Sequence, residues 1–164
     1  MTKFQMKNLI IAFLVIFFAA CKDKNSSKEE VAPDYSTEFV GEYVTQTVNG
    51  GNSTSQNWVV TRLDKNLLNI IYTVDYTLRD QGLEVKRKFV YTLKNVKAID
   101  KLNFTISEDA NYTDDGFDKV RNVQGNGLKI TDANGNIKIG VTFRFSDIDG
   151  TNVSNSDYLE FKKK

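Results

Sequence analysis

The sequence predicts an all-β fold: an antiparallel up-and-down β-barrel of about eight strands, preceded by a cleaved signal peptide. Apolar and polar residues alternate with a period of two from residue 38 onward, and no segment shows convincing helical periodicity. Short turns join the alternating stretches, which leaves no connection long enough for a crossover helix. The first twenty residues differ from this pattern and are considered first.

Residues 1–20 consist of a basic n-region and an apolar h-region. Lys3 and Lys7 supply the positive charge, and residues 9–18 are uninterrupted apolar residues before two alanines. This layout is typical of a secretory signal peptide. The apolar run is too short for the roughly 20 residues that a membrane-spanning helix needs. We therefore expect residues 1–20 to be removed and to take no part in the fold.

The residues around Cys21 resemble the lipobox of bacterial lipoproteins, because Phe18-Ala19-Ala20 places small residues before the single cysteine of the chain. The resemblance implies cleavage before Cys21, acylation of its thiol and new amino group, and a membrane as partner. Several acyl chains anchor a protein stably, whereas one is marginal. The alternatives are an ordinary secreted protein with a free cysteine and a buried structural thiol, although a residue next to a cleavage site cannot lie in a core.

The residues after Cys21 bear on the destination of the chain. Lys22 is not the aspartate that retains lipoproteins at the inner membrane in the enterobacterial sorting rule, so this resemblance implies the outer membrane. Residues 22–24 are similar to the surface-export signals of Bacteroidota lipoproteins, and the choice between a periplasmic and a cell-surface position stays open. Residues 21–36 are polar and contain the only proline, which predicts a flexible tether after the acylated cysteine.

The composition excludes several classes of function. A chain of 164 residues fits one domain, and without histidine it can form neither a Ser-His-Asp triad nor an imidazole metal site. The 22 basic and 21 acidic residues nearly cancel, so no nucleic-acid partner is expected. We expect no cofactor, and an enzyme ranks third among the function classes considered.

The clearest predicted element is a hairpin built on the loop 79–82. A four-residue loop pairs Leu78 with Leu83. Carrying this register outward pairs Tyr72 with Phe89, so that apolar residues meet apolar residues across the hairpin.

A second hairpin is predicted around Asn134-Gly135, a dipeptide that suits a type I′ turn. It places Ile130 opposite Ile139 and turns Lys129 outward. Further strands are expected at residues 39–48, 57–63, 102–107, 137–146 and 157–162.

A meander of this length most simply closes into a barrel, because an open sheet would leave hydrophobic edges. The main alternative is a two-sheet β-sandwich with Greek-key connections. Residues 39–43, Phe-Val-Gly-Glu-Tyr, resemble the Gly-x-Trp opening of the lipocalin and calycin barrels, with Tyr43 in place of the tryptophan. The resemblance implies a lipocalin-like barrel domain over residues 37–164 and is to the barrel class rather than to lipocalins proper.

Five residues are candidates for binding a small apolar or amphipathic ligand inside the barrel. Arg87 is the one charged residue on an apolar strand face that includes Tyr91, so it must meet a carboxylate, carbonyl groups, water or an anionic ligand. The alternatives for Arg87 are an internal salt bridge and a position at the barrel mouth. Trp58 is either a second binding residue or part of the core. A cavity lined by Tyr43, Tyr72, Arg87 and Tyr91 would favour a ligand.

Two acidic loops, residues 111–118 and 147–152, contain oxygen ligands suited to calcium but match no standard loop, so solvated turns are the favoured interpretation. Asn-x-Ser/Thr motifs would be glycosylated only in a eukaryotic pathway, against which the lipobox argues. The main alternative to a ligand-binding barrel is a filled barrel that serves as a structural or protein-interaction module of the envelope, with an envelope protein as partner.

Overall fold

The computed structural model describes residues 32–164, and residues 34–164 form one compact unit. The expected signal peptide, Cys21 and most of the expected tether lie outside the described residues. No helix in the described part of the chain is both long and apolar enough to cross a membrane. In chain order, the elements are η1 (Ser36–Glu38), β1 (Gly41–Asn49), β2 (Asn52–Asp64), β3 (Leu67–Asp80), β4 (Leu83–Ala98), β5 (Asn103–Asp114), β6 (Phe117–Thr131), β7 (Ile137–Ser146), β8 (Ser154–Asn155) and β9 (Leu159–Lys163).

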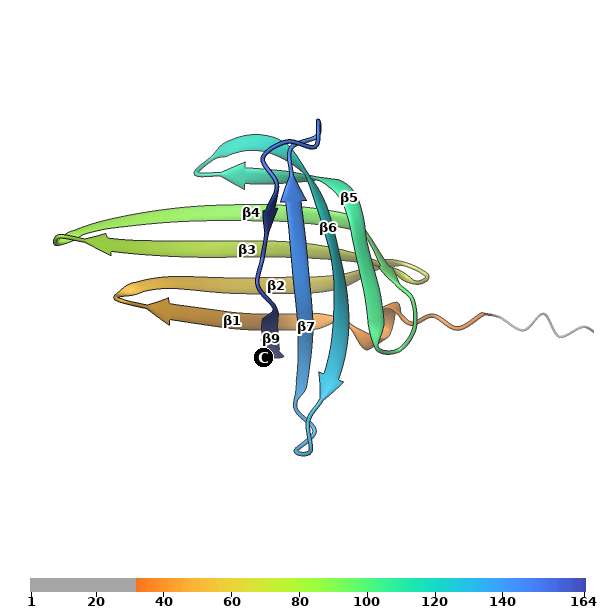
Figure 1. Ribbon diagram of the computed structural model, residues 1–164. Helices are drawn as coiled ribbons and strands as arrows, with labels where there is room; N and C mark the ends of the chain where they lie inside the picture. Colours follow the sequence, from red (N-terminus) through yellow and green to blue (C-terminus); the bar gives the residue numbers. More distant parts are fainter. Residues whose placement is uncertain (1–31) are drawn as a thin grey trace, which may run out of the picture. The chain divides into compact units, whose positions relative to one another are not determined.

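Eight of the nine strands in residues 32–164 form a closed antiparallel ring. Strands β1 to β7 each pair with the next along the chain, and β9 lies between β7 and β1. Figure 1 shows β6, β7 and β9 passing across β1 to β4. The up-and-down barrel is confirmed, and the sandwich is excluded because backbone pairing runs around the whole ring.

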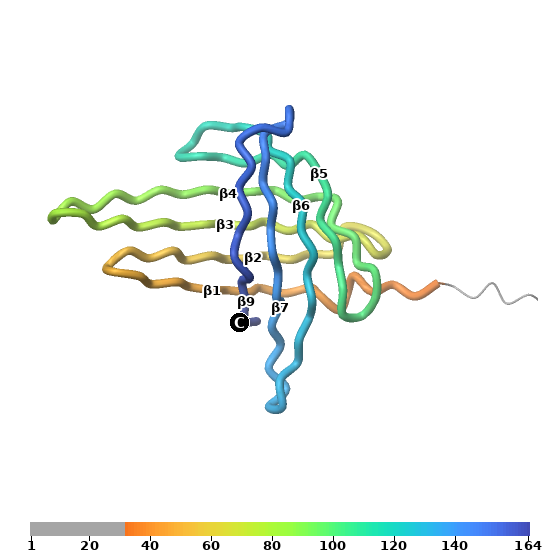
Figure 2. Tube along the Cα trace, in the orientation of Figure 1, coloured from red at the N-terminus to blue at the C-terminus, as the bar shows by residue number. Residues whose placement is uncertain are grey.

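Two hairpins continue beyond the ring. Strand β1 pairs with β9 only at Tyr43 and Val44, so residues 45–49 have no strand partner on that side within the described chain. Residues 83–88 of β4 likewise precede its first pair with β5. The ends of the β1–β2 and β3–β4 hairpins therefore project past the crossing strands, as the tube in Figure 2 shows. We call the end of the barrel at which these hairpins turn the mouth.

Aromatic side chains fill the centre of the barrel. Trp58 is fully buried, and its ring centroid lies 4.4 Å from that of Phe161 and 5.7 Å from that of Phe143. Tyr72 stacks on Phe143, with ring centroids 5.3 Å apart, and also meets Trp58 at 5.9 Å. Because rings from β2, β3, β7 and β9 meet here, the centre is a packed core.

The end opposite the mouth is sealed by the segment that leads into β1. Phe39 is fully buried and meets Phe104 edge to face, with ring centroids 5.3 Å apart. The hydroxyl of Tyr43 donates a hydrogen bond of 2.9 Å to the Phe39 carbonyl. At the same end, Lys129 Nζ lies 2.7 Å from a carboxylate oxygen of Glu38.

The β3–β4 hairpin differs from the predicted register by two residues. Its turn is the two-residue Gln81-Gly82, in which both residues have positive φ angles of 47° and 82°, as a type I′ turn requires. Tyr72 therefore faces Tyr91 rather than Phe89. Since side chains alternate with a period of two, a shift by two residues leaves every side chain on its predicted face.

The β6–β7 hairpin differs from the prediction by one residue. Among the residues of its loop, Gly135 has a positive φ angle and Asn134 does not, so the turn is not type I′. Instead the Asp132 carboxylate accepts hydrogen bonds from the backbone amides of Asn134 and Asn136, both at 2.9 Å, and holds a longer loop. Ile130 consequently faces Lys138, and Lys129 points inward with its side chain only 11% exposed. The prediction that Lys129 points outward is wrong.

Candidate functional site

Five aromatic side chains, Val74 and Arg121 line a pocket of about 240 Å³ at the mouth. We call it the mouth pocket. Its residues come from β3 to β7, and the barrel closure brings β7 to the others. The complete lining is Tyr72, Val74, Phe89, Tyr91, Tyr112, Arg121 and Phe145.

Three tyrosines form a stacked row along one side of the pocket. Tyr72, Tyr91 and Tyr112 occupy directly paired positions on β3, β4 and β5. Ring centroids are 5.7 Å apart between Tyr72 and Tyr91 and 5.0 Å apart between Tyr91 and Tyr112, with nearly parallel planes. Cross-strand pairing thus turns three separate residues into one continuous aromatic surface.

Burial raises the pKa values of Tyr72 and Tyr91, two of the three stacked tyrosines. It raises the pKa of Tyr72 above its ordinary value, and the neighbouring Tyr91 adds to this effect. Burial also raises the pKa of Tyr91, although the nearby Arg121 guanidinium opposes the shift. The Tyr72 hydroxyl donates a hydrogen bond to the side-chain carbonyl of the buried Gln56. Tyrosine hydroxyls are neutral near pH 7 even at their ordinary pKa of about 10, and the upward shifts of Tyr72 and Tyr91 act in the same direction.

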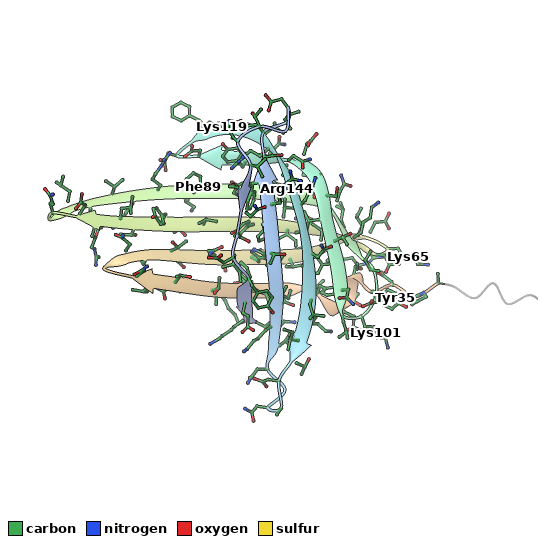
Figure 3. All side chains as sticks on the ribbon, viewed as in Figure 1. Tyr35, Lys65, Phe89, Lys101, Lys119 and Arg144 are labelled. Atoms are coloured by element: carbon green, nitrogen blue, oxygen red, sulfur yellow. The ribbon has the colours of Figure 1, made fainter. Side chains whose placement is uncertain are left out.

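Three cations stand at the rim, each over a ring of the lining. They are Arg87 over Phe89 at 5.4 Å, Lys119 over Tyr112 at 5.8 Å and Arg121 over Phe145 at 5.8 Å. Phe89 and Lys119, both labelled in Figure 3, come from β4 and β6. Such contacts favour a cation over the face of an aromatic ring.

Two of the three cations have close carboxylate partners. Arg87 lies 2.9 Å from an oxygen of Asp114 and 3.2 Å from one of Asp115. Lys119 lies 3.0 Å from the second oxygen of Asp114. The structure therefore places Arg87 at the rim of the mouth, with its side chain 47% exposed, rather than in an internal salt bridge.

Arg121 differs from the other two. Its Nη2 donates a hydrogen bond of 2.9 Å to the carbonyl of Asn152, but its buried Nε has no hydrogen-bond partner among the described residues. The nearest carboxylate, Asp147, lies 3.7 Å from that Nε. This distance is longer than the 2.7–2.9 Å of a charge-assisted hydrogen bond.

The structure brings two of the five predicted ligand residues into the mouth pocket. Tyr72 and Tyr91 line it, whereas Tyr43 and Trp58 lie fully buried in the packed interior and Arg87 sits on the rim. These residues do not share one cavity.

Sequence reasoning missed Tyr112, Arg121 and Phe145. The sequence signal that could have found these three residues is the alternation of inward and outward side chains along each strand. Arg121 shares the inward face of β6 with the buried Val123, and Tyr112 shares that of β5 with Ala110. Placing them together required the pairing of β6 with β7.

Carboxylates of the two acidic loops bind neighbouring groups of the protein itself. Asp114 and Asp115 bind the rim cations, and the Asp149 carboxylate accepts hydrogen bonds from the amide and hydroxyl of Thr151. Among residues 32–164, no three carboxylates gather in a way that could hold a metal ion.

No known protein family, curated protein or solved structure matches this chain.

Proposed function

We propose that the chain is a lipid-anchored protein of the bacterial outer membrane whose lipocalin-like barrel binds a small apolar or amphipathic molecule in the mouth pocket. The observation that carries the proposal is the pocket itself, in which five aromatic rings and one arginine surround about 240 Å³. Ligand sites typically combine an apolar lining with few polar groups. No catalytic step forms part of the proposal.

The size of the pocket limits the ligand. Sites for drug-sized molecules enclose roughly 300–1,000 Å³. The mouth pocket, at about 240 Å³, suits a molecule of one or two rings or the end of a longer chain. The packed centre around Trp58 gives a ligand no room to go deeper.

Native mass spectrometry of protein purified from its own envelope tests the ligand proposal. Val74 lines the pocket, so V74F fills part of it, whereas V90F places the same ring on the outward face of β4. The wild type and V90F should retain the same small molecule, and V74F should lose it. Absence of any retained molecule, or equal retention by V74F, would contradict the proposal.

The lipid anchor is supported by the sequence Phe18-Ala19-Ala20-Cys21. Mass spectrometry of the N-terminal peptide should find an acylated Cys21 as the first residue of the mature protein. The C21S variant should keep residues 1–20 and carry no acyl chain. A free thiol at Cys21 in the wild type would contradict lipid anchoring.

A protein-interaction module is the second candidate, and the projecting hairpins favour it. Residues 45–49 of β1 and 83–87 of β4 have a free strand edge within the described chain, and Leu83 is 74% exposed. Free edges can accept a strand from another protein. Cross-linking through a photoreactive residue at position 83 should then capture one envelope protein, and capture of none would count against this candidate.

A further inference from the structure

We infer that the mouth pocket selects a carboxylate: its ligand is a small molecule with an aromatic or apolar body and one carboxylate group, which takes the place of Asp147 beside Arg121. The inference rests on the proposed function, since it concerns the same pocket. It adds the chemical class of the ligand and the residue that recognises it.

The lining of the mouth pocket carries a single charged side chain among the described residues, that of Arg121. Its side chain is 19% exposed, lies against the Phe145 ring and is tied to the carbonyl of Asn152. A guanidinium held in this way is already oriented, so binding an anion costs little further ordering.

Arg121 has a hydrogen-bond donor that no acceptor among the described residues uses. Its Nε is buried without a hydrogen-bond partner, and Asp147 stands 3.7 Å away. A buried donor without an acceptor is unfavourable. A carboxylate is the group that accepts two parallel N–H bonds from a guanidinium. A ligand carboxylate at hydrogen-bond distance would therefore satisfy Arg121 better than Asp147 does.

A ligand carboxylate beside Arg121 would take the position that Asp147 holds. The Arg121 Nε is covered by protein, and the carboxylate paired with it is that of Asp147, so the inference includes a movement of Asp147 away from Arg121. The Asp147 side chain is 44% exposed and belongs to the connection between β7 and β8, so it can turn to water when a ligand replaces it. Its second oxygen already accepts a hydrogen bond from the Asn152 side chain.

The other rim cations do not compete for the ligand carboxylate. Arg87 and Lys119 are held by Asp114 and Asp115 at 2.9–3.2 Å. An anion would have to replace these close ion pairs, whereas at Arg121 it replaces a distant one. The apolar body of the ligand then meets Tyr91 and Phe145, whose ring centroids are 5.3 Å apart.

The test compares two isosteric probes, 2-naphthoate and its neutral amide 2-naphthamide. Calorimetric titration uses protein purified from cells that express the full chain, held in lipid nanodiscs so that no detergent enters the pocket. A charge-assisted bond exceeds a neutral one enough to make naphthoate bind about tenfold more tightly. R121Q should reduce this preference to about onefold. The matched control R144Q alters an exposed arginine on the outward face of β7 and should keep it.

The variant D147N tests the exchange without altering Arg121. It removes the competing carboxylate, so naphthoate should bind several times more tightly while the affinity for naphthamide stays the same. Equal affinities of the wild type for the two probes, an unchanged preference in R121Q, or a weaker preference in D147N would each overturn the inference. Failure of the wild type to bind either probe would overturn it too. The proposed function is tested separately by native mass spectrometry, in which the wild type should retain a natural ligand and V74F should lose it.

Discussion

Replacing Phe161 with alanine should destabilise the barrel by about 4 kcal/mol, because this residue fixes the closing strand to the core. Phe161 is fully buried, and its ring centroid lies 4.4 Å from that of Trp58. Strand β9 pairs with β7 at four positions and with β1 at only two, so side-chain packing has to hold the closure. Truncating a buried phenylalanine costs about 3–5 kcal/mol. The weak backbone pairing to β1 places F161A in the middle of that range or above it.

Urea unfolding followed by circular dichroism and by the fluorescence of Trp58, the single tryptophan, measures this loss. At about 4 °C per kcal/mol, the melting temperature should fall by about 16 °C. Y158A is the matched control, because Tyr158 is exposed and lies over Gly140 outside the core, and it should cost less than about 1 kcal/mol. A loss below about 1 kcal/mol in F161A would refute the packed centre and the role of β9 in closing it.

Two further predictions concern the end of the barrel opposite the mouth. G127A should cost about 3 kcal/mol in a denaturant titration, because a β-carbon there would lie 2.0 Å from the Phe104 ring; wild-type stability would show that this packing is absent. Hydrogen bonds from Ser36, the amide of Asn66 and the Arg62 guanidinium hold the pKa of Asp34 well below its usual range. Because the folded-state pKa is lowered, Asp34 contributes stability above its unfolded pKa of about 4 and loses it as the pH falls. Unfolding midpoints at pH 3 and pH 7 should therefore differ more in the wild type than in D34N, and equal differences would contradict this role.

The fold class followed from the sequence because side-chain alternation tolerates some errors of register. In the β3–β4 hairpin, the structure has the two-residue turn Gln81-Gly82 in place of the predicted four-residue loop, and every face stayed correct. In the β6–β7 hairpin the register differs by one residue, which exchanges the inward and outward faces of β6. There the Asp132 side chain fixed a longer loop, which moved Lys129 to the inside. A side chain that bonds to its own loop outweighed the turn preference of Asn-Gly.

The candidate site could be predicted only in part. Tyr72 and Tyr91 lie on strand faces whose alternation is plain in the sequence, and they do line the mouth pocket. Arg121 escaped prediction because the inward face of β6 continues with Gly125 and Gly127, which weaken the apolar pattern. The meeting of Arg121 with Phe145 also depends on the register of the β6–β7 hairpin, which differs by one residue from the predicted one.

A crystal structure of the protein with bound 2-naphthoate tests the central claim most directly, namely that the barrel has a packed centre and binds its ligand at the mouth. The naphthalene ring should lie against Tyr91 and Phe145, with the carboxylate within hydrogen-bond distance of Arg121 and Asp147 turned away. Trp58 should keep its contact with Phe161. A probe found in the centre beside Trp58, or on the outer face of the barrel, would contradict the account.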